Sequence, residues 1–241
     1  MRRAGRYDLV TLDMGFTLVD LHSGVNRMLL DVGRRVRPEL TLDEVHIAQS
    51  QFWDAWNLRE AEQVWEPSPA ADRAAGREID AVILHLLGVD DPAIIDEVNA
   101  ETRRRYSDIA TYTIFPDAIP ALEALRASVP VLGIVSNWGW HLPELCVSLG
   151  LDRHVDFIVA SARVGAAKPN AKIFRHALAM CSCAPERALH VGDSLVADVR
   201  GAEAVGMTGV LLDRSGSSNE VGCPVVQKLT ALPPLLRQAG R

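Results

Sequence analysis

Short apolar segments that alternate with amphipathic segments constrain the fold of this chain more than any other feature. Five apolar runs are typical of buried strands, and each ends where polar residues begin: 8–12, 129–135, 156–160, 188–191 and 208–212. Helical patterns separate the later runs, at 118–127, 141–149, 171–180 and 195–205, and a last strand and helix are expected within 225–236. Asp117 is the expected N-cap of the first of these helices. This alternation predicts an α/β fold with a doubly wound parallel sheet.

Residues 20 to about 108 have a different pattern. They contain helix-like stretches at 25–35, 42–59, 73–87 and 92–108, with no convincing strand. Trp53 and Trp56 are three residues apart and would share one helix face, where they either pack inside this segment or line a substrate cleft. We therefore predict a core domain formed by 1–19 and 109–241, with a helical domain inserted at 20–108.

Composition excludes several classes of function. The net charge of −6 and the pI near 5.6 argue against a nucleic-acid partner, which requires a basic face. No apolar run approaches the roughly 20 residues of a membrane span, and the basic N-terminus is not followed by an apolar signal core. The four cysteines show no paired Cys-x-x-Cys spacing, so free thiols are expected. We expect a cytoplasmic protein without a membrane or nucleic-acid partner.

Polar residues follow the predicted strands, at the edge where an open parallel sheet binds its ligands. They are Asp13 after the first strand, Ser136 and Asn137 after the second, Asp193 and Asp198 after the fourth, and Lys168 ahead of a helix. Each alone would be an ordinary turn, cap or surface charge. Together they bring three carboxylates to one edge, where the carboxylates repel one another unless a cation lies among them. Oxygen ligands suit Mg²⁺, and a lysine with a hydroxyl would hold an anion, so phosphoryl chemistry with an aspartate nucleophile is predicted.

The order of these residues resembles the haloacid dehalogenase-like superfamily, and in particular its subfamily IA. The first motif matches at Asp13 and Thr17-Leu18 in TLDMGFTLVD, the second at Ser136 in VLGIVSN, and the third at Lys168-Pro169. The fourth matches as HVGDSLVADVRGAEAVGM, the Gly-Asp-x4-Asp form of the family's phosphatases, and FPDAIPALEAL also resembles the family. The likeness covers residues 7 to about 213, although the inserted segment matches only in position and type. SNWGWHLPELCVSLGL and ALHVGDSLVADVRGAEAVG are most similar to the rhythmically-expressed-gene-2-like branch.

The resemblance implies a Rossmann-like core with a helical cap at 20–108 and a role for each matching residue. Asp13 would attack phosphorus and become an aspartyl-phosphate. Mg²⁺ would lie between Asp13, the main-chain carbonyl of Gly15 and Asp193, with Asp198 completing the shell. The implied substrate is a small phosphorylated metabolite, whose identity the sequence does not give; nor does it give an oligomeric state. The substrate-binding residues would be Thr17, Ser136, Asn137 and Lys168, of which Lys168 would also balance the charge of the nucleophile.

Gly15 replaces the second aspartate in the two-aspartate motif of the family's phosphatases, and Phe16 stands where that motif has glycine. The missing carboxylate would act as general acid and base, which is worth roughly 10²- to 10⁴-fold in rate, or about 3–5.5 kcal/mol. Three interpretations follow: a phosphatase without the usual acid, a metal-free 2-haloacid dehalogenase, or a non-catalytic protein that binds a phosphorylated ligand or another protein. The retained pair Asp193 and Asp198 favours the phosphatase, with Asp20 or His22 as possible substitute proton donors.

Overall fold

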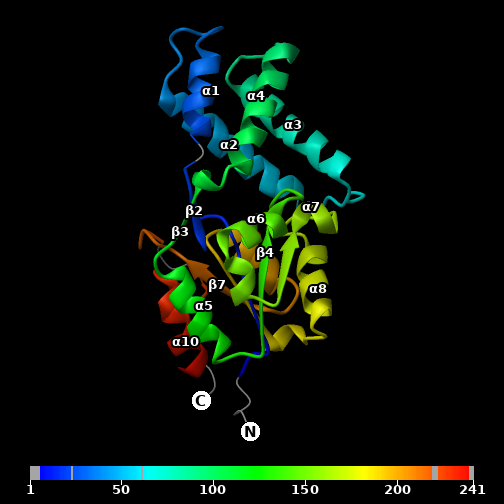
Figure 1. Ribbon diagram of the computed structural model, residues 1–241, viewed down its shortest axis with the longest axis vertical. Coiled ribbons are helices and arrows are strands. Elements are labelled where there is room, and N and C mark those ends of the chain that lie inside the picture. The colour runs from blue at the N-terminus through cyan, green and yellow to red at the C-terminus, as the bar shows by residue number, and fades with distance from the viewer. Residues whose placement is uncertain (1–5, 23, 61, 219–221, 239–241) are drawn as a thin grey trace.

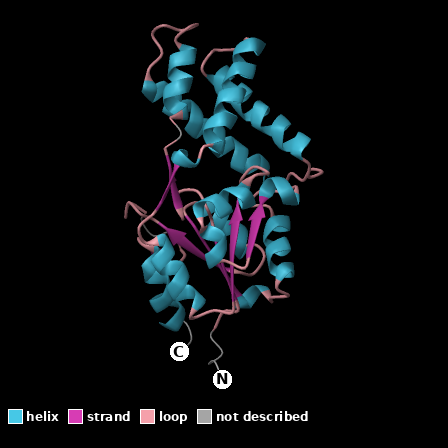
Figure 2. Ribbon diagram, in the orientation of Figure 1, coloured by secondary structure: helices cyan, strands magenta, loops and turns pink. Residues whose placement is uncertain are grey.

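The computed structural model describes residues 6–22, 24–60, 62–218 and 222–238. Within them, six parallel strands form one sheet in the order β5-β4-β1-β6-β7-β8. Their bounds are β1 Leu9–Leu12, β4 Val131–Ser136, β5 Phe157–Ala160, β6 Ala188–Gly192, β7 Thr208–Leu212 and β8 Val225–Val226. Helices cover both faces of the sheet (Figures 1 and 2), which confirms the predicted doubly wound α/β fold.

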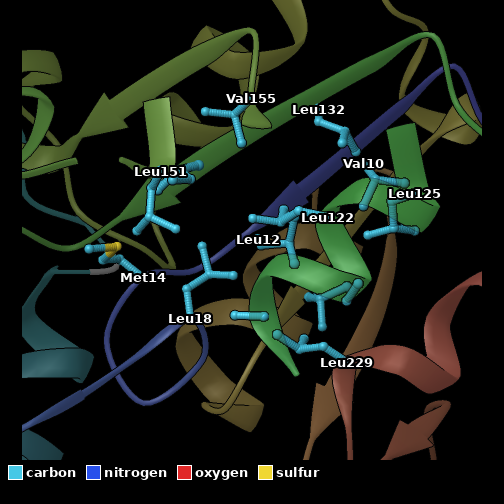
Figure 3. Close-up of a cluster of buried hydrophobic side chains, with 14 of the residues drawn as sticks. Val10, Leu12, Met14, Leu18, Leu122, Leu125, Leu132, Leu151, Val155 and Leu229 are labelled. Carbon is cyan, nitrogen blue, oxygen red and sulfur yellow. The ribbon is translucent and has the colours of Figure 1, made fainter. Parts of the chain in front are cut away.

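Alternate residues of the strands pack against opposite layers of helices. Val10 and Leu12 of β1 belong to a cluster that Figure 3 shows with Leu122 and Leu125 of α5 (Ala118–Arg126). Leu9 faces the other layer, which includes α8 (Ala171–Met180). Other described helices of the core are α6 Leu142–Leu149, α7 Ser161–Val164, α9 Gly201–Glu203 and α10 Leu232–Gln238, with the short helices η1 Ile109–Thr111, η2 Leu151–His154, η3 Pro185–Arg187, η4 Leu195–Arg200 and η5 Leu229–Ala231. The period-two alternation of buried side chains therefore forms two hydrophobic layers around the sheet.

The helical segment between β1 and the rest of the sheet has its own hydrophobic cluster. Its described helices are α1 Val25–Gly33, α2 Leu42–Glu60, α3 Pro69–Leu86 and α4 Pro92–Ser107, and they lie together at one end of the molecule (Figure 1). Ser68 and Asp91 cap α3 and α4, each followed by a proline at the first helical position. The Trp56 side chain is partly buried and packs against this cluster, whereas the Trp53 side chain is exposed.

Two short strands connect the helical segment to the core, and the sequence pattern did not indicate either of them. β2 (Val19–Leu21) and β3 (Tyr112–Ile114) pair antiparallel, with Val19 opposite Ile114. Three residues are too few to show a period-two pattern, and the partner strands are about 90 residues apart in the chain.

Two further local predictions were wrong in detail. Asp117 makes no side-chain bond to the start of α5; its carboxylate instead accepts from the main-chain N–H of Leu229 at 2.7 Å and pairs with Arg214. The helix expected at 195–205 begins as the π-helix η4 (Leu195–Arg200), which α9 continues. The cysteines are free thiols, as expected.

Candidate active site

The carboxyl ends of three neighbouring strands define the candidate site. β1 pairs with β4 on one side and with β6 on the other. Asp13 follows β1, Ser136 ends β4, and Asp193 follows β6, so the topology brings these three residues to one edge of the sheet. The main-chain N–H of Asp13 donates to the carbonyl of Val191 at 2.9 Å, which fixes the start of the loop after β1.

Lys168 lies between two carboxylates in the interior of the protein. Its Nζ is 2.5 Å from Oδ1 of Asp13 and 2.5 Å from Oδ1 of Asp198, and its side chain is only 2% exposed. Burial disfavours the ammonium, but the two carboxylates outweigh it and raise the pKa of Lys168. Lys168 is therefore a buried cation shared by Asp13 and Asp198.

Asn137 holds the main chain of this lysine. Its Nδ2 donates to the Lys168 carbonyl at 2.8 Å, and its Oδ1 accepts from the Lys168 N–H at 2.6 Å. The amide of Asn137, expected to bind substrate, is thus engaged with the segment that carries Lys168. Ser136 is buried, and a hydrogen bond from it to Asp13 partly opposes the rise in the pKa of Asp13 that burial causes.

Asp13, Asp193 and Asp198 converge closely enough to hold one cation. One oxygen from each lies within 4.8 Å of the others. Loss of solvation at the rim of the site, together with the charges of Asp13 and Asp198, raises the pKa of Asp193 to about 7. Thr17 Oγ1 is 3.5 Å from Oδ1 of Asp193, at the limit of a hydrogen bond. The donor set consists of oxygens alone, and its mutual repulsion would be relieved by a divalent cation, so these residues fit Mg²⁺.

Asp198 depends on a local distortion of its helix. It lies in η4, where the N–H of Val199 reaches back five residues to the carbonyl of Ser194. The carboxylate accepts from the Ser194 N–H at 2.9 Å, and a side chain at Gly192 would meet its Cγ at 2.1 Å. Burial alone would raise the pKa of Asp198, but Lys168 and His190 outweigh this and lower it.

The sequence interpretation missed two residues around the site, His190 and Arg214. His190 is fully buried in β6, with Nε2 3.0 Å from Oδ1 of Asp198 and Nδ1 2.8 Å from Oγ1 of Thr11. Arg214 donates from Nη2 to the carbonyl of Thr17 at 2.7 Å. A histidine within an apolar strand is a visible sign of a buried polar contact, whereas nothing in the sequence places Arg214 beside the loop after β1.

The loop after β1 turns sharply at Gly15 and Phe16. Gly15 forms an isolated bridge with Val19, and Phe16 has φ 53°, a conformation that is unusual for a side chain of this size. Asp20 and His22, the expected substitute donors, are 39% and 58% exposed and lie 3.5 Å from each other. Among the bonds of the described residues, neither contacts Asp13, so the structure does not bring them into the site.

Comparison with known proteins identifies the class to which this fold and site belong. The family model for haloacid dehalogenase-like hydrolases matches residues 7–206. The chain therefore belongs to the haloacid dehalogenase-like hydrolase family. Its placement in one subfamily of these proteins remains a prediction.

Two curated relatives show the range of the similarity. The chain is 34% identical over 157 residues to haloacid dehalogenase-like hydrolase domain-containing protein 3 of Mus musculus, a match that covers 64% of this chain and 62% of that protein. It is 36% identical over 104 residues to the phosphoserine phosphatase of Thermus thermophilus, covering 43% of this chain and 42% of that enzyme. The matches thus span less than two thirds of either relative.

Solved structures share the fold over nearly the whole chain. The magnesium-bound HAD-hydrolase YfnB of Bacillus subtilis has a TM-score of 0.73 at 18% identity, covering 96% of this chain and 99% of that one. The L-2-haloacid dehalogenase of Xanthobacter autotrophicus has a TM-score of 0.68 at 20% identity, covering 96% of this chain and 98% of that one.

None of the helices among the described residues combines the length and the apolar character that a membrane span requires.

Proposed function

We propose that this hydrolase is a Mg²⁺-dependent phosphatase of small phosphorylated metabolites, with Asp13 as its nucleophile. The observation that carries the proposal is the convergence of three carboxylates within 4.8 Å around a buried lysine. The Thermus thermophilus relative, a phosphoserine phosphatase, supports the reaction type. Asp13, Asp193 and Asp198 would hold the metal with the main-chain carbonyl of Gly15, and Mg²⁺ would supply positive charge to the phosphoryl oxygens.

In this proposal, each residue of the site has a defined role in the reaction. Lys168 holds Oδ1 of Asp13, so the attacking atom is Oδ2. As the Oδ2–phosphorus bond forms, the bond from phosphorus to the ester oxygen breaks, and that oxygen leaves with the electron pair and then takes a proton from water. A water molecule next attacks phosphorus, the phosphorus–Oδ2 bond breaks with its electron pair going to Oδ2, and the attacking water gives up a proton to the solvent, which releases inorganic phosphate and restores the Asp13 carboxylate. Ser136 and Thr17 bind phosphoryl oxygens, and Asn137 keeps Lys168 in place.

We further propose that residues 20–108 act as a cap over the core formed by 1–19 and 109–241. The separate hydrophobic cluster of α1–α4 and the two-strand connection through β2 and β3 support this division. The loop after α2 also touches the core beside the candidate site, where the N–H of Trp65 donates to the carbonyl of Gly165 at 3.0 Å. Substrate would enter between these two parts.

The test is a screen of phosphorylated metabolites, aryl phosphates and acetyl phosphate, with Mg²⁺ and with excess chelator. Hydrolysis should require Mg²⁺ and be lost in Asp13→Asn, which keeps the size of the side chain but removes the nucleophile. Full activity in chelator, or an active Asp13→Asn variant, would overturn the proposal. Chloride release from 2-chloropropionate tests the dehalogenase interpretation directly, although a metal-free enzyme would have no use for Asp193.

A further inference from the structure

The space beside Gly15 contains an aromatic side chain. A Cβ atom at this position would stand 3.3 Å from Cζ3 of Trp138 and 3.6 Å from Cδ1 of Leu21. The first distance is tighter than ordinary van der Waals contact, so a side chain at position 15 requires Trp138 to shift by a few tenths of an ångström. A side chain that begins here would therefore start against an indole edge and a methyl group, both of which are apolar.

Trp138 is held in this position from two sides. Its main-chain N–H donates to Oγ of Ser161 at 3.1 Å, and its main-chain carbonyl accepts from the same hydroxyl at 3.2 Å and from the N–H of Ala162 at 3.2 Å. Its ring packs against Tyr112 of β3, with centroids 5.8 Å apart at 45°. Trp138 therefore packs against β3, the strand whose Tyr112 pairs with Leu21 of β2, and lies beside the loop that carries Asp13 and Gly15.

From these contacts we infer that Trp138 determines leaving-group specificity: its indole edge crowds the space in which a side chain at position 15 would begin, and its partly exposed ring is offered to the leaving group. The inference rests on the proposed phosphatase function. No carboxylic acid lies at this position to protonate the departing oxygen, and an indole N–H does not ionise in water. The leaving oxygen must therefore depart as an anion that water protonates afterwards, which a phenolate or carboxylate does far more readily than an alkoxide.

The aromatic surface of Trp138 favours one of two good leaving groups, phenolate, over the other, acetate. A phenolate can stack on the indole as its bond to phosphorus breaks, and aromatic pairs contribute about 0.5–1.5 kcal/mol beyond simple burial. Acetate has no ring to stack. The substrate class assigned to the site is therefore planar aryl phosphates, in preference to alkyl phosphates and to acyl phosphates of similar leaving ability.

The kinetic test compares phenyl phosphate, acetyl phosphate and glycerol phosphate in Mg²⁺. Trp138→Ala should lower kcat/KM for phenyl phosphate by roughly 5- to 10-fold, with little change for acetyl phosphate, while Trp138→Phe keeps most of the preference. Trp140→Ala is the matched control, because Trp140 lies in the same loop but its ring packs against Arg163 instead. Equal losses on phenyl and acetyl phosphate in Trp138→Ala would overturn the stacking role.

A second measurement does not depend on activity. Gly15→Asp should lower the thermal midpoint of the wild-type protein, because Trp138 leaves little room for the new side chain. The same substitution should lower the midpoint of the Trp138→Ala variant far less, because the indole is absent there. The double variant, and not Gly15→Asp alone, should gain up to roughly 10²-fold on glycerol phosphate. Equal destabilisation by Gly15→Asp in both backgrounds would show that Trp138 does not occupy this place. A protein inactive on every ester would overturn the proposed function and the leaving-group preference together, whereas the stability comparison would still decide what occupies the space beside Gly15.

Discussion

At the scale of single residues, Lys168 controls the electrostatics of the site. It is the cation that contacts both Asp13 and Asp198, and water barely reaches it. A buried charge left without its partner is strongly unfavourable, so the lysine and the carboxylates depend on one another. Lys168 therefore has a structural role in addition to balancing the charge of the nucleophile.

Lys168→Met should lower the free energy of unfolding by about 3–5 kcal/mol in chelator, since it leaves two carboxylates buried without a cation. Urea denaturation measures the change. Adding Asp198→Asn should recover part of the loss, because it removes one of the uncompensated charges. Lys172→Met, four residues along the chain on the exposed face of α8, is the control and should be nearly neutral. A loss below about 1 kcal/mol in Lys168→Met would contradict the buried ion pairs.

At the scale of elements, the loop between α2 and α3 docks on the core through main-chain contacts. Besides the bond from Trp65 to Gly165, Nδ2 of Asn170 donates to the carbonyl of Gln63 at 3.1 Å. Gly165 has φ 72°, and a Cβ there would lie 2.1 Å from the carbonyl oxygen of Trp65. Only glycine permits this close approach.

Gly165→Ala should displace this loop, and Gly150→Ala provides a matched control. Gly150 has φ 73° but nothing within 4 Å of its Cβ position, so alanine there adds only the strain of the left-handed conformation, about 1–2 kcal/mol. Gly165→Ala adds the clash to the same strain. We expect faster hydrogen exchange over 62–68 in Gly165→Ala and an unchanged rate in Gly150→Ala. Identical exchange in the two variants would mean that the loop does not rest on Gly165.

Asp80 makes the packing of α3 on α4 dependent on pH. It is buried, its Oδ2 accepts from Nδ2 of Asn99 at 2.8 Å, and burial raises its pKa. The folded state therefore binds the proton more tightly than the unfolded state. The contribution of Asp80 to the free energy of unfolding is therefore fully present below the pKa that Asp80 has in the unfolded state. This contribution is lost as the pH rises through the pKa that Asp80 has in the folded state.

Asp80→Asn should raise the thermal midpoint at pH 7 by about 2–4 °C, the effect of roughly 1 kcal/mol in a chain of this size. The amide keeps an acceptor for Asn99 but carries no charge to desolvate. The advantage over wild type should shrink as the pH falls toward 4, where the wild-type carboxyl takes up its proton. Asp31→Asn, at an exposed position of α1, serves as the control and should show no such pH-dependent gain. A variant less stable than wild type at pH 7 would show that the ionised carboxylate is favoured.

At the scale of the whole molecule, the features that the sequence predicted correctly are those that depend on the local residue pattern and on the topology of the sheet. Apolar runs located β1 and β4–β7, and the rule that parallel strands share one carboxyl edge placed Asp13 and Asp193 together. Contacts between distant segments were not predictable: β2 pairs with β3 across the helical insert, and Arg214 takes Asp117 away from its expected capping role. The same limit applies to Trp138, whose position beside Gly15 follows from the fold alone.

The stability of the whole molecule should depend on Mg²⁺ if the three carboxylates form a metal site. A ligand that binds only the folded state at 100 times its dissociation constant stabilises that state by about 2.7 kcal/mol, or roughly 5–10 °C in thermal midpoint here. A titration of MgCl₂ at constant ionic strength should therefore raise the midpoint in wild type. Asp193→Asn should abolish most of the rise, because it removes one of three converging ligands. Asp213→Asn is the matched control, since Asp213 follows β7 at the same sheet edge but is engaged with Ser215 and Ser218. Asp213→Asn should show the full Mg²⁺-dependent rise in thermal midpoint, whatever its midpoint is without Mg²⁺. An equal response in all three proteins would mean that the cation acts by general screening and that Asp193 binds no metal.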